Sequence, residues 1–263
     1  MRTATKHALE AVKREVDMLT AADADSARKL FDVAETLASN KQLAVALVDR
    51  SAEASAKRSL ARRVFGERIG IGANNVLDAA VSQKWESEQQ LITAIQDAGI
   101  RAVAQVSGAH ERIGNELDSF LEAISSNGEL ELALGSRLAG SAGKIALIER
   151  LFARSLSAET LDILRSLVTL PSSQRIRRLT TTARASVADQ AGRQVATVTV
   201  ARALTEAQLE RLRAALTKRF GHDVSVNQVI DPSAVGGMRV EFGDEVIDDT
   251  AAARLKNLRL QLA

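Results

Sequence analysis

The chain has 263 residues, more than one average domain needs, and 46% of them are hydrophobic, which excludes a globally disordered protein. Its 35 Lys and Arg are nearly balanced by 33 Asp and Glu, so a net charge of +2 gives little support to non-specific nucleic-acid binding. The lack of cysteine excludes disulfides, thiolate metal sites and a cysteine nucleophile.

The composition favours helices over a sandwich or a barrel. Aromatic residues make up only 3% of the chain, and small or unbranched side chains, which lose little rotamer freedom in a helix, dominate it. No apolar run reaches the roughly 18 residues that a membrane-spanning helix needs. Met1 to Leu19 carries three acidic residues and does not resemble a secretory signal. We therefore expect a cytoplasmic location.

From Thr3 to about Ala191 the pattern predicts helices almost without interruption. Glycine and Asx clusters predict where these helices end: Ala22 to Asp25, Ser39-Asn40, Gly70 to Asn75, Gly99, Gly108, Asn127-Gly128 and Gly140 to Gly143. No heptad pattern persists over several repeats, so the helices are expected to pack as bundles rather than as a coiled coil.

The helical region contains an internal repeat at an offset of 87 residues, in which Asn40 to Phe65 aligns with Asn127 to Phe152 without a gap. The recurring residues include Asn40, Leu43, Ala46, Leu47, Arg50, Lys57, Leu60, Arg63 and Phe65, which return as Asn127, Leu130, Ala133, Leu134, Arg137, Lys144, Leu147, Arg150 and Phe152. The register continues through Leu77 over Leu164 and Val81 over Val168. We interpret this as a duplicated helical unit, with copies at residues 1–90 and 91–190.

Residues 191–263 follow a different pattern and predict a small β-α-β-β-α domain. Gln194 to Ala203 alternates like a strand, and Thr205 to Gln208 forms a capping box before a helix that ends at Gly221. Two further strands are predicted at Val224 to Ile230 and Gly237 to Phe242. A last helix is predicted to begin near Asp248 or Asp249, whose carboxylates suit a helix N-terminus. The fold class is therefore mainly α, with two tandem bundles and a small α/β domain.

Motifs for catalysis or cofactor binding are not found. Gly140 to Ile145 is the nearest approach to a phosphate loop, but it lacks the first glycine and the Ser or Thr after Lys144. The acidic cluster consists of Glu241, Asp244, Glu245, Asp248 and Asp249, and each of these has a structural explanation in a hairpin or a helix start. His7, His110 and His222 are too widely spaced for a metal motif or a triad pattern. We predict no catalytic residue, no metal and no cofactor.

Two basic clusters leave an alternative function open. They consist of Lys57, Arg58, Arg62, Arg63 and Arg68, and of Arg175, Arg177 and Arg178. Solvated helix faces explain them most simply, and a surface for an acidic partner helix is a further interpretation. The alternative hypothesis is a helical nucleic-acid-binding or regulatory adaptor, although stacking aromatics and a broad basic face are not evident.

The C-terminal segment from Asp231 to Arg259 resembles the signature of the delta subunit of F-type ATP synthases, whose mitochondrial relative is the oligomycin-sensitivity-conferring protein. The signature residues are Asp231, Pro232, Gly236, Gly237, Gly243, Asp244 and Asp248, followed by Arg254-Leu255 and Leu258-Arg259. Ala234 stands where the family usually has Leu or Ile. Gly236 and Gly237 suit close strand approach and are interpreted as fold requirements rather than contacts.

The resemblance covers residues from about 88 to 263, so 1–87 are an additional copy, as in actinobacterial members of this family. It implies a non-catalytic stator, a peripheral-stalk subunit that couples proton-driven rotation to ATP synthesis. The bundle at 91–190 would hold the N-terminal helices of the alpha subunits, and 191–263 would engage the b stalk. Since the chain begins at Met1 without a membrane span, b is expected to be a separate chain. Membrane contact would be indirect, at the cytoplasmic face of the bacterial plasma membrane, with no nucleic acid.

Amphipathic partner helices are expected to dock in apolar grooves between helices. The candidate partner-binding residues are Leu161, Leu164, Leu167 and Val168, with Arg175 and Arg178 at the rim. The alternative is that these apolar residues belong to the internal core. The sequence leaves open which copy binds the alpha subunits, what the additional copy contacts, and whether the protein regulates ATP hydrolysis.

Overall fold

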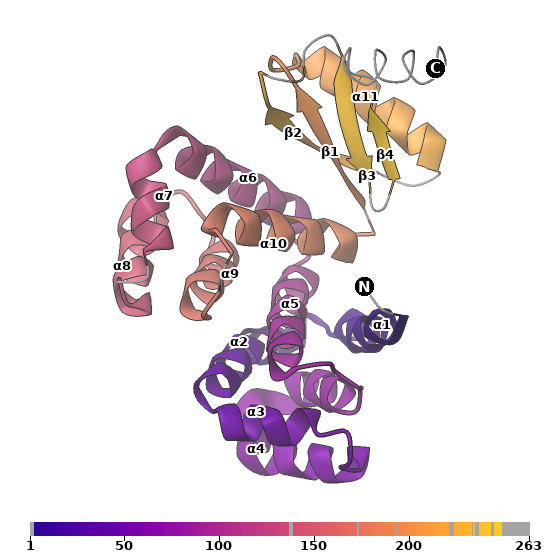
Figure 1. Cartoon of the computed structure of the whole chain (residues 1–263), viewed down its shortest axis with the longest axis vertical. Coiled ribbons are helices and arrows are strands. Elements are labelled where there is room, and N and C mark those ends of the chain that lie inside the picture. The colour runs from indigo at the N-terminus through magenta and orange to yellow at the C-terminus, as the bar shows by residue number, and fades with distance from the viewer. Residues whose placement is uncertain are drawn as a thin grey trace, which may run out of the picture. The chain divides into compact units, whose positions relative to one another are not determined.

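The computed structural model describes residues 3–136, 139–172, 174–192, 194–220, 224–232, 234, 237–242 and 245–248. The chain divides into two compact units, Met1–Gln190 and Ala191–Ala263 (Figure 1). The first is built of helices and the second combines a sheet with a helix, so the prediction of a mainly α fold with a small C-terminal α/β domain is confirmed. Among the described residues, no helix has both the length and the apolar character needed to cross a bilayer.

The first unit contains ten α-helices in its described part, with a short 3-10 turn at Ala21–Asp23 between the first two. They are α1 (Thr3–Asp17), α2 (Ala24–Ser39), α3 (Lys41–Val48), α4 (Ala54–Val81), α5 (Glu88–Ser107), α6 (His110–Ser126), α7 (Gly128–Gly135), α8 (Ser141–Phe152), α9 (Ala158–Thr169) and α10 (Ile176–Gln190).

The helix boundaries repeat with the same offset as the sequence. α3 begins at Lys41 and α7 at Gly128, while α4 begins at Ala54 and α8 at Ser141, and both separations are 87 residues. By the same offset α2 corresponds to α6, α5 corresponds to α10, and α1 corresponds to α5 itself. When the two segments of α4 on either side of Gly70 are counted separately, the duplicated unit is a six-helix pattern in which α5 is the last helix of the first copy and the first helix of the second.

The hydrophobic cores show the same sharing of α5. One core gathers buried residues from α1 to α5, and Ile95 and Ala98 of α5 belong to it. The other gathers residues from α5 to α10, beginning with Ile100 and Ala104. The predicted boundary between residues 90 and 91 falls inside the first turns of α5, so a cut there would divide a helix that both cores use.

Local sequence signals explain where α5 begins and ends. Ser87 caps its N-terminus by accepting a hydrogen bond from the backbone N–H of Gln90. Gly108 ends it in the left-handed conformation with φ of 63°, which glycine adopts without steric cost. The predicted break at Gly108 is confirmed, whereas Gly99 lies inside the helix, where it makes room for the ring of Phe31.

α4 consists of two helical segments that meet at a kink. Gly70 interrupts it with φ of 75° and ψ of 171°, and helical geometry resumes at Ile71. In the second copy the equivalent chain is divided into α8 and α9, and Ser157, which is 87 residues after Gly70, caps α9 by accepting from Thr160 N. The predicted break in the glycine cluster from Gly70 to Asn75 is therefore present, with the non-helical Gly70 between two helical segments.

The second unit is a four-stranded sheet with one described helix. Its elements are β1 (Gln194–Val200), α11 (Glu206–Phe220), β2 (Val224–Ile230), β3 (Met238–Phe242) and β4 (Glu245–Asp248). The strand order is β2-β1-β3-β4, with β1 parallel to β2 and antiparallel to β3. Alternate residues such as Val198, Val240 and Leu216 of α11 form its core. Half of the predicted capping box is present, because Gln208 Oε1 accepts from Thr205 N at 2.8 Å.

One strand of this unit was not predicted. Asp248 is the last residue of β4 and lies opposite Arg239 of β3 in the backbone register, so extended structure continues to this residue. The antiparallel pairing of β3 with β4 extends the sheet by one strand. The acidic residues of β4 do not follow a typical strand pattern, so this strand was not predicted. The alternative helix start at Asp249 and the predicted Arg-Leu repeat lie outside the described residues.

Candidate partner-binding surfaces

The apolar residues predicted to contact a partner lie in the second core. Leu161, Leu164, Leu167 and Val168 are all on α9 and expose 6%, 0%, 4% and 8% of their surface. The amphipathic spacing was therefore correct for a buried helix face. In this chain by itself these side chains face other helices of the unit, so their contact with a partner stays a prediction.

The predicted rim residues Arg175 and Arg178 are exposed, the first just before α10 and the second in its first turn. Their neighbour Arg177 donates to Glu131 Oε2 of α7 at 2.7 Å. The arginines thus stand at one end of α10, next to an acidic residue of the second bundle, and two of the three point to solvent.

A cavity of about 240 Å³ lies between the two bundles, and no sequence motif indicated it. α2 supplies one wall with Arg28 and Phe31, α5 supplies Gln96, and α9 supplies Asp162 and Arg165. Its lining mixes apolar and charged side chains, so it differs from a closed hydrophobic core. Because its walls come from residues far apart in sequence, only the folded structure brings them together.

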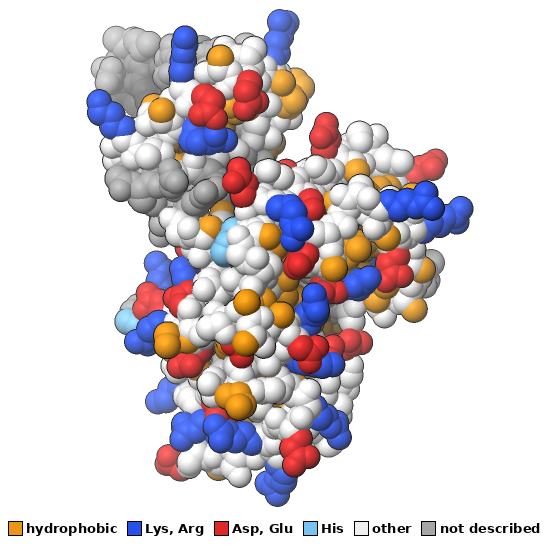
Figure 2. Space-filling view, turned by 180° about the vertical axis from the view of Figure 1, so that it is seen from behind, with side chains coloured by type: hydrophobic (Ala, Val, Ile, Leu, Met, Phe, Trp, Pro, Cys, Tyr) orange, Lys and Arg blue, Asp and Glu red, His pale blue; other side chains and the backbone are white. Residues whose placement is uncertain are grey.

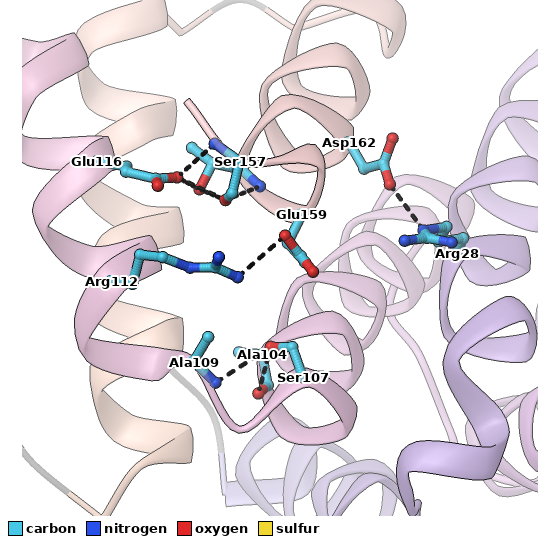
Figure 3. A network of polar contacts seen from close by, with 10 residues as sticks. Arg28, Ala104, Ser107, Ala109, Arg112, Glu116, Ser157, Glu159 and Asp162 are labelled. Atoms are coloured by element: carbon cyan, nitrogen blue, oxygen red, sulfur yellow. Dashed lines mark hydrogen bonds and ion pairs between the residues drawn. The ribbon is translucent and has the colours of Figure 1, made fainter. Parts of the chain in front are cut away.

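α9 is held by polar contacts to α6 on one side and to α2 on the other (Figure 3). Glu116 of α6 accepts from the backbone N–H of Ser157 at 2.9 Å, from the Ser157 hydroxyl and from the Thr160 hydroxyl. Arg112 reaches Glu159 at 3.2 Å. On the opposite flank Arg28 Nε of α2 donates to Asp162 Oδ2 at 2.9 Å, which joins the first bundle to the second.

These contacts shift the pKa of the Glu116 carboxyl group. Burial raises the pKa of Glu116, but the hydrogen bonds from Ser157 and Thr160 outweigh this effect and hold the pKa below its usual value. Asp118 shows the opposite balance, because burial raises its pKa more than nearby Arg184 lowers it. Both groups have structural partners, Ser157 and Thr160 for Glu116 and Arg184 for Asp118.

A second polar network joins α1, α5 and α10. Asp189 Oδ2 of α10 accepts from Lys13 Nζ of α1 at 3.1 Å and from Arg101 of α5 at 2.6 Å. Arg101 also donates to Asp97 Oδ2 at 2.7 Å, and Gln190 Nε2 donates to Asp17 Oδ1 at 2.6 Å. These pairs connect the first helix of the unit with its last helix, and no sequence motif indicated them.

The basic clusters are partly paired within the fold. Arg62 pairs with Asp78 and Arg177 with Glu131, Arg58 donates to the Ser82 hydroxyl at 3.0 Å, and Lys57 is buried. On the face seen in Figure 2, blue and red side chains are interspersed over the helical unit without a broad basic area. This arrangement does not support the nucleic-acid-binding alternative, which depends on a continuous basic surface.

The segment that resembles a phosphate loop and Glu241 of the acidic cluster both belong to regular secondary structure or its ends. Gly140 precedes α8, and Gly143 and Lys144 lie inside that helix. Glu241 pairs with Arg239 of the same strand at 2.6 Å. Among the described residues, no three His, Asp or Glu side chains come together in a way that could hold a metal ion.

The signature residues are only partly described. Asp231 and Pro232 directly follow β2, and Asp231 N donates to Val200 O of β1 at 2.9 Å. Gly237 is exposed just before β3. Gly236, Gly243 and Asp244 lie outside the described residues. Among the described signature residues, Asp231, Pro232 and Gly237 lie in connections of the sheet and Asp248 lies in β4, and their structural role stays a prediction.

Comparisons with known proteins agree with this architecture. A family model described as "ATP synthase delta (OSCP) subunit" matches residues 99–262. The "ATP synthase subunit delta" of Leifsonia xyli is 40% identical over 242 residues, which cover 92% of this chain and 91% of that protein. The protein of the same name from Streptomyces avermitilis is 32% identical over 99% of this chain and 98% of its own length. That from Acidothermus cellulolyticus is 34% identical over the full length of both chains.

The relatives match the helical unit in both of its copies as well as the C-terminal unit, whereas the family model begins within α5, at the second copy. The chain therefore belongs to the ATP synthase delta (OSCP) subunit family, in a form whose helical domain is duplicated around one shared helix.

Proposed function

We propose that this chain is the non-catalytic peripheral-stalk subunit of a bacterial F-type ATP synthase. The observation that carries the proposal is its similarity, over nearly its whole length, to proteins named ATP synthase subunit delta. The protein holds the catalytic head against rotation while the central shaft turns, and the partner subunits perform the chemistry. Polar networks that tie helix to helix suit a part whose task is mechanical.

The finer assignment of partners follows the two-unit division. The helical unit binds the N-terminal helices of the alpha subunits through its second bundle, and the C-terminal unit engages the end of b. Support comes from the division at Gln190, which separates two compact units that can hold different proteins. The complex places the chain at the cytoplasmic face of the plasma membrane, which it contacts only through its partners.

Co-purification with defined fragments tests this assignment. The full chain, residues 1–190 and residues 191–263 are each offered to the isolated synthase head and to the soluble part of b. We expect 1–190 to retain the head and 191–263 to retain b. If 1–190 keeps all of the b binding of the full chain, the division of roles is wrong.

The nucleic-acid alternative is checked with the same preparation. A gel-shift titration of the full chain with duplex DNA and single-stranded RNA at physiological salt is expected to show no retardation. Binding with a steep salt dependence would instead revive that function.

A further inference from the structure

The two bundles are joined through α5, which belongs to both of them. A joint of this kind would allow one bundle to rotate relative to the other about the axis of α5. Each bundle wraps its own side of this helix, and α5 contributes residues to both cores. The shared helix α5 resists bending, but by itself it does not prevent the helices of one bundle from rotating about its axis relative to the helices of the other bundle. Contacts between helices of different copies therefore decide whether the unit is one rigid body.

On one flank of α5, side chains of α1 hold the last turn of α10. The Asp189 carboxylate accepts hydrogen bonds from Lys13 and Arg101, and the side-chain amide of Gln190 donates to the Asp17 carboxylate. The Arg101 side chain is only 15% exposed, so its two carboxylate partners act in a partly desolvated setting where pairing is stronger than at an open surface. Ser186 adds a hydrogen bond from α10 to Asp97 of α5.

On the other flank, α2 of the first bundle is fastened to the second. Arg28 bonds to Asp162 of α9. Phe31 packs against both cores, and its ring lies over Gly99 of α5, where a Cβ atom would come within 2.7 Å of it. In Figure 1, α1 and α2 lie to either side of α5. A rotation in either direction must break the contacts of one flank.

We propose that Lys13, Asp17 and Arg28 of the additional copy are positioning residues that brace α10 and α9, so that the duplicated bundles act as one stiff arm. Gln190, which Asp17 holds, is the last residue of the helical unit, directly before the chain enters the C-terminal unit. The brace thus fixes the point at which the chain leaves the helical unit. Its meaning for coupling rests on the proposed stator function, but the rigidity itself is testable on the isolated chain.

A distance measurement between spin labels reports the brace directly. The chain has no native cysteine, so Arg14→Cys on α1 and Ala185→Cys on α10, both at exposed positions, take the labels specifically. A control pair within the second bundle uses Ser119→Cys on α6 with Ala185→Cys. The distances are recorded by pulsed electron paramagnetic resonance in the otherwise unsubstituted chain and in the Lys13→Ala, Asp17→Ala, Arg28→Ala triple variant.

We expect the width of the α1–α10 distance distribution to increase about twofold in the triple variant, while the width for the control pair stays unchanged. A matched variant, Lys29→Ala with Asp32→Ala, removes an ion pair that lies within α2 and is expected to change neither distribution. An unchanged α1–α10 width in the triple variant overturns the proposal. If the triple variant does not fold by circular dichroism, the single variant Lys13→Ala decides by the same criterion, since its side chain is 36% exposed.

A functional measurement separates the brace from the stator role. Membrane vesicles carrying the synthase with the triple variant are tested for ATP hydrolysis and for ATP-driven proton pumping. We expect the head to stay bound and hydrolysis to continue, while protons pumped per ATP decrease. Pumping equal to that with the unsubstituted chain, despite a widened distance distribution, overturns the brace as a coupling element. Failure of the unsubstituted chain to bind the head would overturn the proposed function and leave the distance result standing.

Discussion

At the scale of residues, Leu161, Leu164 and Leu167 form one apolar face of α9, and this face lies in the second core of the helical unit. A groove for a partner and a core demand the same spacing, so sequence alone could not separate them. The pair Lys13 and Asp189 is 176 positions apart, and because charged residues recur along both helices no local pattern selects it.

Gly99 gives a prediction at this scale. Alanine is a better helix former than glycine by about 1 kcal/mol, yet a Cβ atom at residue 99 would lie 2.7 Å from the Phe31 ring. Overpacking of a core costs about 1–3 kcal/mol, so Gly99→Ala is expected to lower the free energy of unfolding. Gly143→Ala on α8 is the control, because its Cβ would meet nothing within 4 Å. Urea denaturation compares the two, and stabilisation by both substitutions would contradict the packing of Phe31.

The Asp189 carboxyl gives a prediction in pH. Burial raises the pKa of Asp189, but the hydrogen bonds and charges of Arg101 and Lys13 lower it by a larger amount. The pKa of Asp189 therefore lies below the ordinary value of about 3.9. A depressed folded-state pKa stabilises the protein above the unfolded value, and this stability is lost as pH falls through the folded value. At neutral pH, Asp189→Asn is expected to cost about 1 kcal/mol, because the side chain is 42% exposed and solvent screens its pairs.

Urea denaturation of the unsubstituted chain and Asp189→Asn over a series from about pH 7 to about pH 2 measures this difference. The difference should be constant down to about pH 4 and shrink only below it. A difference that vanishes already near pH 6 would show that Asp189 is not held charged by these partners.

At the scale of elements, the internal repeat predicts where helices begin, but it does not predict that one helix, α5, belongs to both copies. The offset of 87 residues places α3 over α7 and the start of α4 over that of α8, as the structure shows. The sequence could not show that α5 serves both copies, because a helix buried by two bundles has the same apolar pattern as one in a large core. In the C-terminal unit, β4 escaped prediction because its four residues are half acidic.

The kink of α4 depends on one glycine. Gly70 adopts φ of 75° and ψ of 171°, a region that other residues enter only at a cost of about 1–3 kcal/mol, and its Cβ would lie 2.2 Å from Ser26 Oγ. Gly70→Ala is therefore expected to lower the free energy of unfolding by about 2 kcal/mol. Gly66→Ala in the same helix meets only ordinary contacts at 3.7 Å and serves as the control. Equal thermal midpoints for the two variants would contradict this conformation.

At the scale of the whole molecule, the boundary at Gln190 predicts independent folding. Residues 1–190 contain both helical cores and both inter-bundle networks, so this fragment is expected to unfold cooperatively with a thermal midpoint close to that of the helical unit in the full chain. Circular dichroism and calorimetry check it. By contrast, a fragment cut between residues 90 and 91 should aggregate, because it separates α5 from the first core. A soluble, fully helical fragment 1–90 would show that α5 is dispensable.

The C-terminal signature predicted the family, and the packing supplied what the signature could not show, namely how the additional copy joins the rest. Coupling in reconstituted vesicles tests the central claim most directly. The synthase is assembled with and without this chain, and ATP hydrolysis and ATP-driven proton pumping are measured together. A stator predicts that omission of the chain leaves hydrolysis by the head but abolishes pumping, and that adding the chain back restores it. Pumping of equal extent without the chain would contradict the account.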